Sequence, residues 1–518
     1  MARVTAEAGT KLVRNTLANG VGSAIAILVG LFLTPFLIDR LGLAAYGVWT
    51  LALTLTFAGG YVAVADLGIE GATVRYVAEA SAEEDLAAVS RTVSTSLAVF
   101  CAIGLVLAPV MIALAHPLVD LFGVPVRLRT AATTCFDLVG LQLAFELPSR
   151  AFVAVLEGTQ HFIRYQAVEL ARALLQSALF VVVLLVGGSI AWLAAALALS
   201  SLSALIGFAM VAHRTLPGLH ATPFRARRAE LSRLVRFGGE VLSLRFVSTV
   251  YNQMDKAIVG VALGPRPVGL YEIANKINLA ASTVASVTVS AVMPAAAALR
   301  REAALVRDMY LRGSCYATAL SLPVTVAAFI FAKPLLLGWI GPEARPAIGA
   351  AQLFVAYVAL QVVQNVGSTM VYGTGRIRFP LIVTVIATLL NLVLSILLVG
   401  PMGFSGVIAG TLIANGLAWP VMLGYYLREF DCSLGLWLRR LVAPNLPGLV
   451  LQIAVSLPLY VLVGSTTRSL PLAAALFVAS VAVSMAGFVL IGLRGDDRRA
   501  LTDTLQRALG RTPREMAA

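Results

Sequence analysis

Long apolar stretches recur along the whole chain and are separated by short polar segments. Most contain about 18 or more residues, which is enough for a helix to cross a bilayer core of roughly 30 Å. Strands of a membrane barrel would instead alternate apolar and polar residues over about ten positions. The pattern therefore predicts an all-α polytopic membrane protein with about fourteen transmembrane helices. The expected spans are residues 17–38, 44–65, 92–115, 131–153, 167–187, 190–211, 237–262, 269–297, 313–332, 347–371, 379–399, 404–427, 447–464 and 471–492.

The composition agrees with a chain that lies mostly in lipid. Of the 518 residues, 59% are hydrophobic and 13% are charged, and the mean hydropathy is +0.89. Soluble proteins contain about 25% charged residues. The low share of charge therefore leaves no room for a large soluble domain.

The formal net charge is +13, which in a soluble protein would suggest nucleic acid as a partner. In a membrane protein, basic residues in short loops mark the cytoplasmic side. An even number of spans places both termini on one side, and that side holds most of the 39 Lys and Arg residues. We therefore expect a multi-pass cell-membrane protein with both termini in the cytoplasm and no binding to nucleic acid.

Signals of an enzyme, a nucleotide site or a metal centre are missing from the sequence. It contains no GxxxxGK[ST] loop that could hold a nucleotide. Its four His residues lie in or near loops without ligand spacing, and its four Cys residues show no CxxC spacing. We expect no catalytic residue, no metal and no cofactor.

Several short motifs occur twice in the same order, which indicates an internal repeat. The matches are "LGLAAYGVW" (41–49) with "LGPRPVGLY" (263–271), "AHPLVDLFG" (115–123) with "AKPLLLGWIG" (332–341), and "EGTQ" (157–160) with "YGTG" (372–375). We expect two pseudo-symmetric six-helix lobes followed by an extra helix pair. The predicted parts are an N-terminal lobe (1–211), a basic cytoplasmic linker (212–236), a C-terminal lobe (237–427), the helix pair (428–492) and a cytoplasmic tail (493–518).

Transporters built from parallel repeats place the substrate path between the lobes near the middle of the membrane. Polar side chains at helical spacing within apolar spans point to such a path, because intramembrane polar groups are costly in lipid. The predicted cavity residues are Asn19 and Ser23 in the first span, Arg245, Thr249, Asn252 and Lys256 in the seventh, Asn275, Lys276 and Asn278 in the eighth, and Gln361, Gln364 and Asn365 in the tenth.

Two segments carry a family resemblance. These are "DLGIEGATVRYVAE" (66–79) and "MDKAIVGVALGPRPVGLYEIANKI" (254–277). Together with the two lobes and the extra pair, they make the chain resemble the polysaccharide flippases, in the superfamily of multidrug and toxin extrusion transporters and the lipid II flippase. The resemblance implies transport of an undecaprenyl-diphosphate-linked oligosaccharide from the inner to the outer leaflet of the cytoplasmic membrane by alternating access, for surface polysaccharide biosynthesis. Membrane lipid is then a partner, a glycan polymerase and glycosyltransferases are candidate protein contacts, and a monomer is the expected state.

The predicted polar faces suit such a substrate. Arg can bind phosphate oxygens through two hydrogen bonds, Lys supplies a point charge, and amides and hydroxyls can bind sugar. The resemblance to the lipid II flippase implies that the last two spans hold the polyprenyl tail. The alternative is that this helix pair is merely peripheral.

Several buried charges allow two interpretations. Asp255, Glu146 and Glu240 could exchange protons or cations during transport. Asp255 and Lys256 could equally lock a helix pair together. Glu146 and Arg150 could mark a functional kink near Pro148 or form a simple pair near the inner interface.

Three other functions compete with the glycan flippase. A cation-coupled multidrug exporter of the same fold would favour an acid in the first span, and residues 17–38 contain none. The lipid II flippase would favour deep basic charge in both lobes, and the N-terminal lobe has little beyond Arg150 and Arg172. A membrane glycosyltransferase or ligase would favour paired carboxylates in a sizeable outer loop, and such a loop is missing from the sequence.

Overall fold

The computed structural model describes residues 30–57, 60–289 and 303–493. In this part of the chain every regular element is helical, and ten helices are long and apolar enough to cross a membrane. The predicted all-α membrane architecture is confirmed. By internal contacts the chain divides into unit 1 (residues 1–272 and 399–407) and unit 2 (residues 273–398 and 408–518). The predicted lobe boundaries concern sequence homology and stay a prediction.

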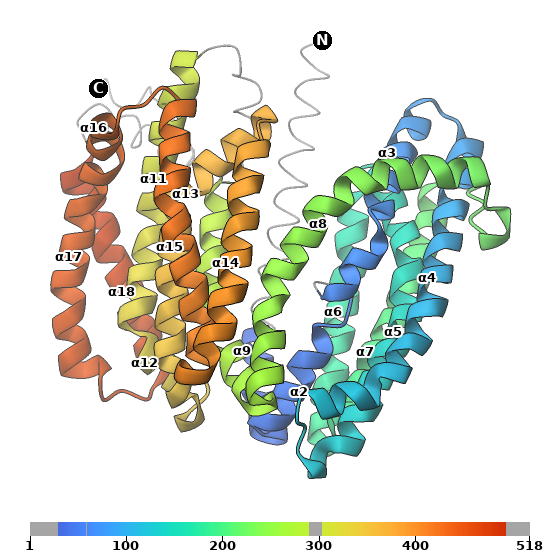
Figure 1. The fold of residues 1–518 in the computed structure, drawn as a ribbon, viewed down its shortest axis with the longest axis horizontal. Coiled ribbons are helices and arrows are strands. Elements are labelled where there is room, and N and C mark those ends of the chain that lie inside the picture. Colours follow the sequence, from blue (N-terminus) through green and yellow to red (C-terminus); the bar gives the residue numbers. More distant parts are fainter. Residues whose placement is uncertain (1–29, 58–59, 290–302, 494–518) are drawn as a thin grey trace, which may run out of the picture. The chain divides into compact units, whose positions relative to one another are not determined.

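Unit 1 is a bundle in which α5 is central and packs against α3, α4 and α7, while α6 packs against α7 (Figure 1). Its elements are a helical stretch over residues 30–41, α2 (Leu43–Leu53), η1 (Tyr61–Asp66), α3 (Ile69–Ala82), α4 (Leu86–Leu121), α5 (Val126–Gly158), α6 (Phe162–Leu185), α7 (Ile190–Thr215), η2 (Pro223–Arg225) and α8 (Arg228–Leu263). The α5 helix is buried on most sides, which explains why it can carry polar groups inside the bundle.

The second predicted span, residues 44–65, is not one continuous helix, and this part of the sequence prediction was wrong. Helix α2 ends at Leu53, and the chain turns so that the Tyr61 amide donates to the Thr54 carbonyl at 2.7 Å. A Cβ on Gly60 would lie 2.4 Å from that same oxygen, so the turn requires glycine there. The chain resumes as the 3₁₀ helix η1, where the buried Asp66 accepts a hydrogen bond from the Glu70 amide at 2.8 Å.

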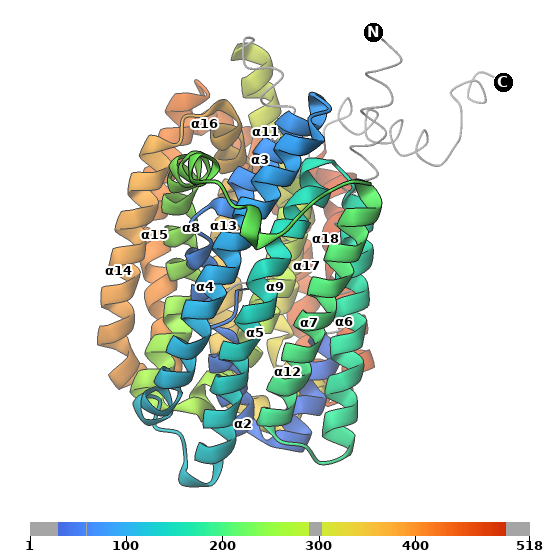
Figure 2. The same cartoon turned by 90° about the vertical axis from the view of Figure 1, so that its right-hand side faces the viewer.

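The polar linker between α7 and α8 is fastened to α4. Figure 2 shows it crossing the end of the bundle before α8 begins. Hydroxyl groups on α4 make the attachment. The contacts are His220 N–H to Ser90 Oγ (3.1 Å), Ser94 Oγ to the His220 carbonyl (3.0 Å), Thr222 N–H to Ser94 Oγ (3.2 Å) and Arg227 N–H to Thr95 Oγ1 (3.2 Å). The linker is thus a bound strap along α4.

Unit 2 contains the remaining helices, except that residues 399–407 belong to unit 1. They are α9 (Pro265–Val289), which begins in unit 1, α11 (Ala303–Ile330), α12 (Ala332–Trp339), η3 (Pro342–Ala347), α13 (Ile348–Thr374), α14 (Arg378–Met402), α15 (Phe404–Glu429), α16 (Leu434–Trp437), η4 (Leu438–Val442), α17 (Ala443–Leu459), η5 (Tyr460–Gly464), α18 (Leu470–Gly487) and η6 (Phe488–Gly492). Within it, α11 packs against α13, and α17 packs against α18.

Buried polar side chains attach the last two long helices to the rest of unit 2. Gln452 of α17 donates to the Pro323 carbonyl of α11 at 2.8 Å and to Ser480 Oγ of α18 at 3.1 Å. Ser456 is hydrogen-bonded to the same Ser480 hydroxyl at 2.7 Å. Each of these three side chains is almost completely buried. Helices α17 and α18 are therefore integrated into the packing of unit 2.

Residues matched by the sequence repeat adopt matching backbone conformations. Gly42 and Gly264, which precede α2 and α9, have φ of +79° and +82°. Gln160 and Gly375, in the "EGTQ" and "YGTG" motifs, are both left-handed, with φ of +58° and +79°. After each of the latter two, the next amide bonds to a carbonyl five residues back, as in a Schellman ending of a helix. The repeat is thus visible in where and how helices begin and end.

Candidate functional site

Close glycine contacts join α2 to the start of α9 within unit 1. A Cβ on Gly47 would lie 1.8 Å from the Pro265 carbonyl oxygen, and one on Gly269 would lie 2.8 Å from the Leu43 carbonyl oxygen. Only glycine permits backbones to approach this closely. Gly47 and Gly269 are equivalent positions of the sequence repeat, so the two homologous motifs pack directly against each other.

Charged and hydroxyl groups join α8 to α9 beside this glycine contact. Lys256 Nζ lies 2.9 Å from Glu272 Oε2, and both side chains are largely buried. Tyr271 donates its hydroxyl hydrogen to Asp255 Oδ2 at 3.3 Å. We call these four residues the α8–α9 joint. Each carboxylate in the joint has a different partner, which fixes the register of the two helices.

A second cluster of buried charge lies in unit 1 around Arg150 of α5. Its guanidinium lies 3.1 Å from Glu146 Oε1 and 3.7 Å from Glu70 Oε1 of α3. The same guanidinium lies over the ring of Phe57, 4.7 Å from the centroid, where a cation–π interaction stabilises it. The Arg150 side chain is only 16% exposed. We call Glu70, Glu146 and Arg150 the Arg150 cluster.

Neutral side chains extend the Arg150 cluster to α7. Gln142 donates to Glu146 Oε2, and its amide nitrogen lies 3.0 Å from Ser201 Oγ of α7. The cluster therefore connects α3, α5 and α7. Its two carboxylates and one guanidinium carry a formal charge of −1.

The sequence predicted part of these two sites. The Glu146–Arg150 pair was expected from its spacing of four residues, and it is present. Glu70, Phe57, Gln142 and Ser201 were missed. Glu70 lies inside the family-like "DLGIEGATVRYVAE" segment, and that acidic residue in a mostly apolar motif was the available signal. The sequence also did not predict that Glu272 pairs with Lys256 of the preceding helix.

The predicted cavity residues of unit 2 are all half-buried, and these are Asn275, Lys276, Asn278, Gln361, Gln364 and Asn365. On α9, Asn278 donates to Asn275 Oδ1 at 3.0 Å, and Lys276 is also half-buried. On α13, Gln361 donates to the hydroxyl of Tyr357, and Gln364 donates to the Trp419 carbonyl of α15 at 2.9 Å. These amides contribute to helix packing as well as to the polar face predicted for substrate.

Other predicted site residues lie outside the described part of the structure. Asn19 and Ser23 fall before residue 30, and the side chains of Glu240, Arg245 and Asn252 are not described although their backbone belongs to α8. Thr249 on α8 is half-buried. The predicted face of α8 therefore stays a prediction.

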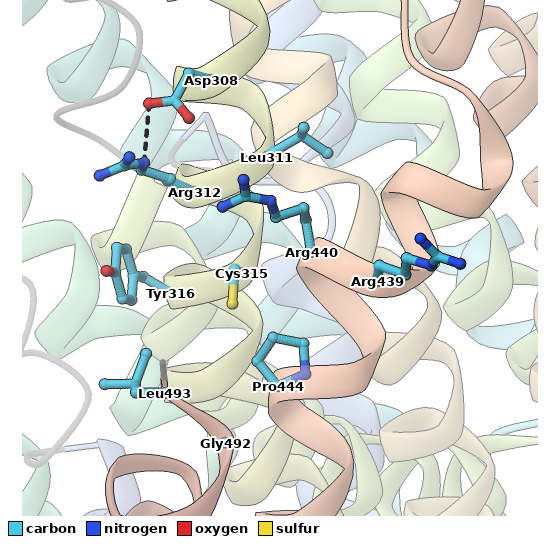
Figure 3. Close-up of a pocket in the computed structure, with 10 residues that line it drawn as sticks. All are labelled: Asp308, Leu311, Arg312, Cys315, Tyr316, Arg439, Arg440, Pro444, Gly492 and Leu493. Atoms are coloured by element: carbon cyan, nitrogen blue, oxygen red, sulfur yellow. Dashed lines mark ion pairs between the residues drawn. The ribbon is translucent and has the colours of Figure 1, made fainter. Parts of the chain in front are cut away.

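A small basic pocket of about 40 Å³ lies in unit 2 between α11, the π-helical turn η4 and η6 (Figure 3). Arg440 extends toward α11 and Arg439 points away from it, while Arg312 pairs with Asp308 at 2.9 Å. The volume is too small for a sugar. Among the described residues, no group of three or more His, Cys, Asp or Glu could hold a metal ion.

The sequence profile of a family described as "Polysaccharide biosynthesis protein" matches residues 40–348, which is more than half of the chain. The chain belongs to this family. The matched region of this polysaccharide biosynthesis family member includes both the Arg150 cluster and the α8–α9 joint. Among curated protein sequences, no match reaches significance.

Solved structures with the same fold are transporters and flippases. An inward-facing multidrug resistance MATE family transporter of the MOP superfamily is 18% identical, covers 79% of this chain and 98% of its own, and has a TM-score of 0.66. The lipid II flippase MurJ, in an inward closed conformation, is 13% identical, covers 90% and 97%, and has a TM-score of 0.72. A MOP superfamily transporter from Pyrococcus furiosus is 16% identical, covers 81% and 95%, and has a TM-score of 0.56.

Identities at this level show a shared fold. Together with the family match and the ten helices of the described residues that are long and apolar enough to cross a membrane, they indicate a multi-pass membrane protein with the fold of these transporters and flippases. The predicted resemblance to the polysaccharide flippases and their superfamily is confirmed.

Proposed function

We propose that this protein moves an undecaprenyl-diphosphate-linked oligosaccharide from the inner to the outer leaflet of the cytoplasmic membrane, for surface polysaccharide biosynthesis. The observation that carries the proposal is the match of residues 40–348 to the polysaccharide biosynthesis family in a chain with a flippase fold. In this proposal both termini face the cytoplasm, because the loops on that side hold most of the basic residues.

The diphosphate of this substrate needs cationic partners during its passage, because bare phosphate charge is strongly disfavoured in hydrocarbon. Lys256 is engaged with Glu272 at 2.9 Å, so we assign it to the α8–α9 joint first. Arg245 is eleven positions before Lys256 on the same helix and is the remaining basic residue of the predicted polar face. We therefore propose Arg245 as the diphosphate contact, with Thr249 and Asn252 of that face beside the sugar.

Transport against a gradient needs an energy source, and the Arg150 cluster is a candidate for the coupling site. Its two carboxylates share one guanidinium at 3.1 and 3.7 Å, so protonation of one carboxylate leaves a neutral pair. Phe57 contacts the cluster from the segment after α2, and Gln142 links it to Ser201 of α7. A change in protonation would therefore alter contacts that hold α3, α5 and α7 together.

The direct test measures where lipid-linked sugar accumulates. Deleting the gene should trap the lipid-linked oligosaccharide on the inner leaflet, detected by its inaccessibility to an external glycan-modifying enzyme in intact spheroplasts. The Arg245→Ala variant should impair surface glycan by more than about tenfold, since one charge-assisted contact contributes about 1.5–3 kcal/mol. Arg127→Ala, which removes an exposed arginine at the start of α5, serves as the matched control.

Two outcomes would contradict the proposal. Full complementation of the deletion strain by Arg245→Ala at normal protein level would remove Arg245 from the mechanism. Unchanged glycan export in the deletion strain, together with increased sensitivity to cationic drugs or arrest of peptidoglycan synthesis, would favour a drug exporter or a lipid II flippase.

A further inference from the structure

A groove of about 620 Å³ lies between α6 and α7 of unit 1. Three arginines line it, and most of the remaining lining is small or apolar. Arg164 is near the beginning of α6, and Arg214 is near the end of α7, so these two lie at the same end of the helix pair. The groove thus combines a basic entrance with an apolar floor.

The two arginines at the entrance keep their charge available. Arg164 donates to the hydroxyl of Thr215 at 2.8 Å, which positions its guanidinium without neutralising it. Both side chains are exposed, and in the described part of the chain no carboxylate forms an ion pair with either. The third arginine, Arg172, lies two turns deeper and pairs with Glu169 at 2.8 Å. Net positive charge is therefore concentrated at the entrance.

The floor of the groove is narrow and apolar. Val168 of α6 and Gly207 of α7 are in close contact, because a Cβ on Gly207 would lie 3.1 Å from Val168 Cγ1. Ala171 and Leu175 continue the α6 wall, and both are exposed. Only about a tenth of the most apolar stretch of α6 is buried, which is the exposure expected of a helix that contacts lipid.

We propose that this groove binds one molecule of an anionic membrane glycerophospholipid. Its phosphate lies between Arg164 and Arg214, and one acyl chain follows the apolar wall past Ala171 to Leu175. Basic pockets between transmembrane helices at the headgroup level bind anionic lipids in this way, with the guanidinium forks contacting phosphate oxygens. Charge complementarity selects the headgroup, and the apolar floor selects a lipid over a free phosphate.

The proposal is tested by measuring lipid retention on the full chain. Protein is purified from nanodiscs containing phosphatidylglycerol or phosphatidylcholine, and bound lipid is counted by native mass spectrometry. We expect one phosphatidylglycerol molecule to be retained. The double variant Arg164→Gln/Arg214→Gln should weaken its binding roughly 25-fold, since each basic side chain near an anionic surface contributes about 1 kcal/mol and 1.4 kcal/mol equals tenfold.

A second variant separates the lipid from a free anion. Ala171→Trp fills the apolar part of the groove and leaves both arginines in place, so it should also reduce phosphatidylglycerol retention. Inorganic phosphate binding at the entrance would be insensitive to that change. Arg127→Gln, at the beginning of α5 and outside the groove, is the matched charge control and should retain the lipid.

Several results would overturn the proposal. These are equal retention of phosphatidylcholine, loss of lipid in the Arg127→Gln control to the same degree, displacement of the lipid by inorganic phosphate, and tighter retention of a polyprenyl phosphate than of phosphatidylglycerol. Unchanged elution from size-exclusion chromatography shows that each variant is folded. Because neither Arg164 nor Arg214 belongs to the Arg150 cluster or to the predicted substrate face, failure here leaves the proposed transport function untouched.

Discussion

The α8–α9 joint and the Arg150 cluster both bury carboxylates beside a single cation, yet they distribute the contacts differently. In the joint, Glu272 pairs with Lys256 at 2.9 Å and Asp255 accepts from Tyr271. In the cluster, Glu70 and Glu146 approach the same guanidinium at 3.7 and 3.1 Å. Because each carboxylate of the joint has its own partner, the stability of the joint depends on all four residues. A shared cation allows the cluster to lose one carboxylate charge and keep an ion pair, which is the property that a coupling site needs.

Removing the shared cation should have the largest effect. Arg150→Met leaves two buried carboxylates without their common partner, so we expect the free energy of unfolding to fall by about 3–5 kcal/mol. Thermal unfolding of the detergent-solubilised protein and the yield in the membrane measure this loss. Arg150→Lys, which keeps the charge without the fork, should recover part of it. A wild-type melting temperature in Arg150→Met would refute the shared-cation interpretation.

Removing a carboxylate charge from the joint should have an intermediate effect. In Glu272→Gln, Lys256 keeps an amide partner but loses its counter-charge, so we expect a loss of about 2 kcal/mol of stability. The double variant Lys256→Met/Glu272→Leu should be nearly as stable as the wild type, because both members of the pair are then apolar. If the double variant is less stable than Glu272→Gln alone, the Lys256–Glu272 pair does not act independently of the other contacts in the joint.

The same chemical change in the cluster should have the smallest effect on stability. Glu70→Gln removes the more distant of the two carboxylate charges and leaves the Glu146–Arg150 pair at 3.1 Å. We expect stability within about 1 kcal/mol of the wild type. We also expect the rate of glycan transport in inverted vesicles to fall severalfold, since the cluster no longer carries the extra negative charge that the proposed coupling uses. Transport at the wild-type rate would exclude Glu70 from coupling.

Local patterns in the sequence predicted what depends on short-range physics. Apolar length predicted the membrane helices, and the spacing of Glu146 and Arg150 predicted their contact. The repeat motifs marked helix ends that the structure shares, such as Gly42 and Gly264. These features require only the helix period and the preference of glycine for positive φ.

Long-range packing decided what the sequence left open. The Glu70–Arg150 contact joins helices eighty positions apart, and no periodicity in one chain encodes such a pairing. Residues 44–65 are apolar throughout and fitted one membrane span, but the tight turn at Gly60 interrupts the helix. The apolar content of a segment measures its preference for lipid. It does not reveal a break in the helix when other hydrogen bonds satisfy the backbone groups that the break frees.

The strap between α7 and α8 has a consequence for how unit 1 sits in the bilayer. Its backbone is hydrogen-bonded to the hydroxyls of Ser90, Ser94 and Thr95. Arg225 and Arg227 are therefore held at a fixed level along α4. Phe224, directly before Arg225 in the turn η2, is almost fully exposed at 97%. An aromatic ring next to arginines prefers the boundary between headgroups and acyl chains. We therefore expect this segment to act as a depth marker that keeps the bundle from sinking into or rising out of the leaflet.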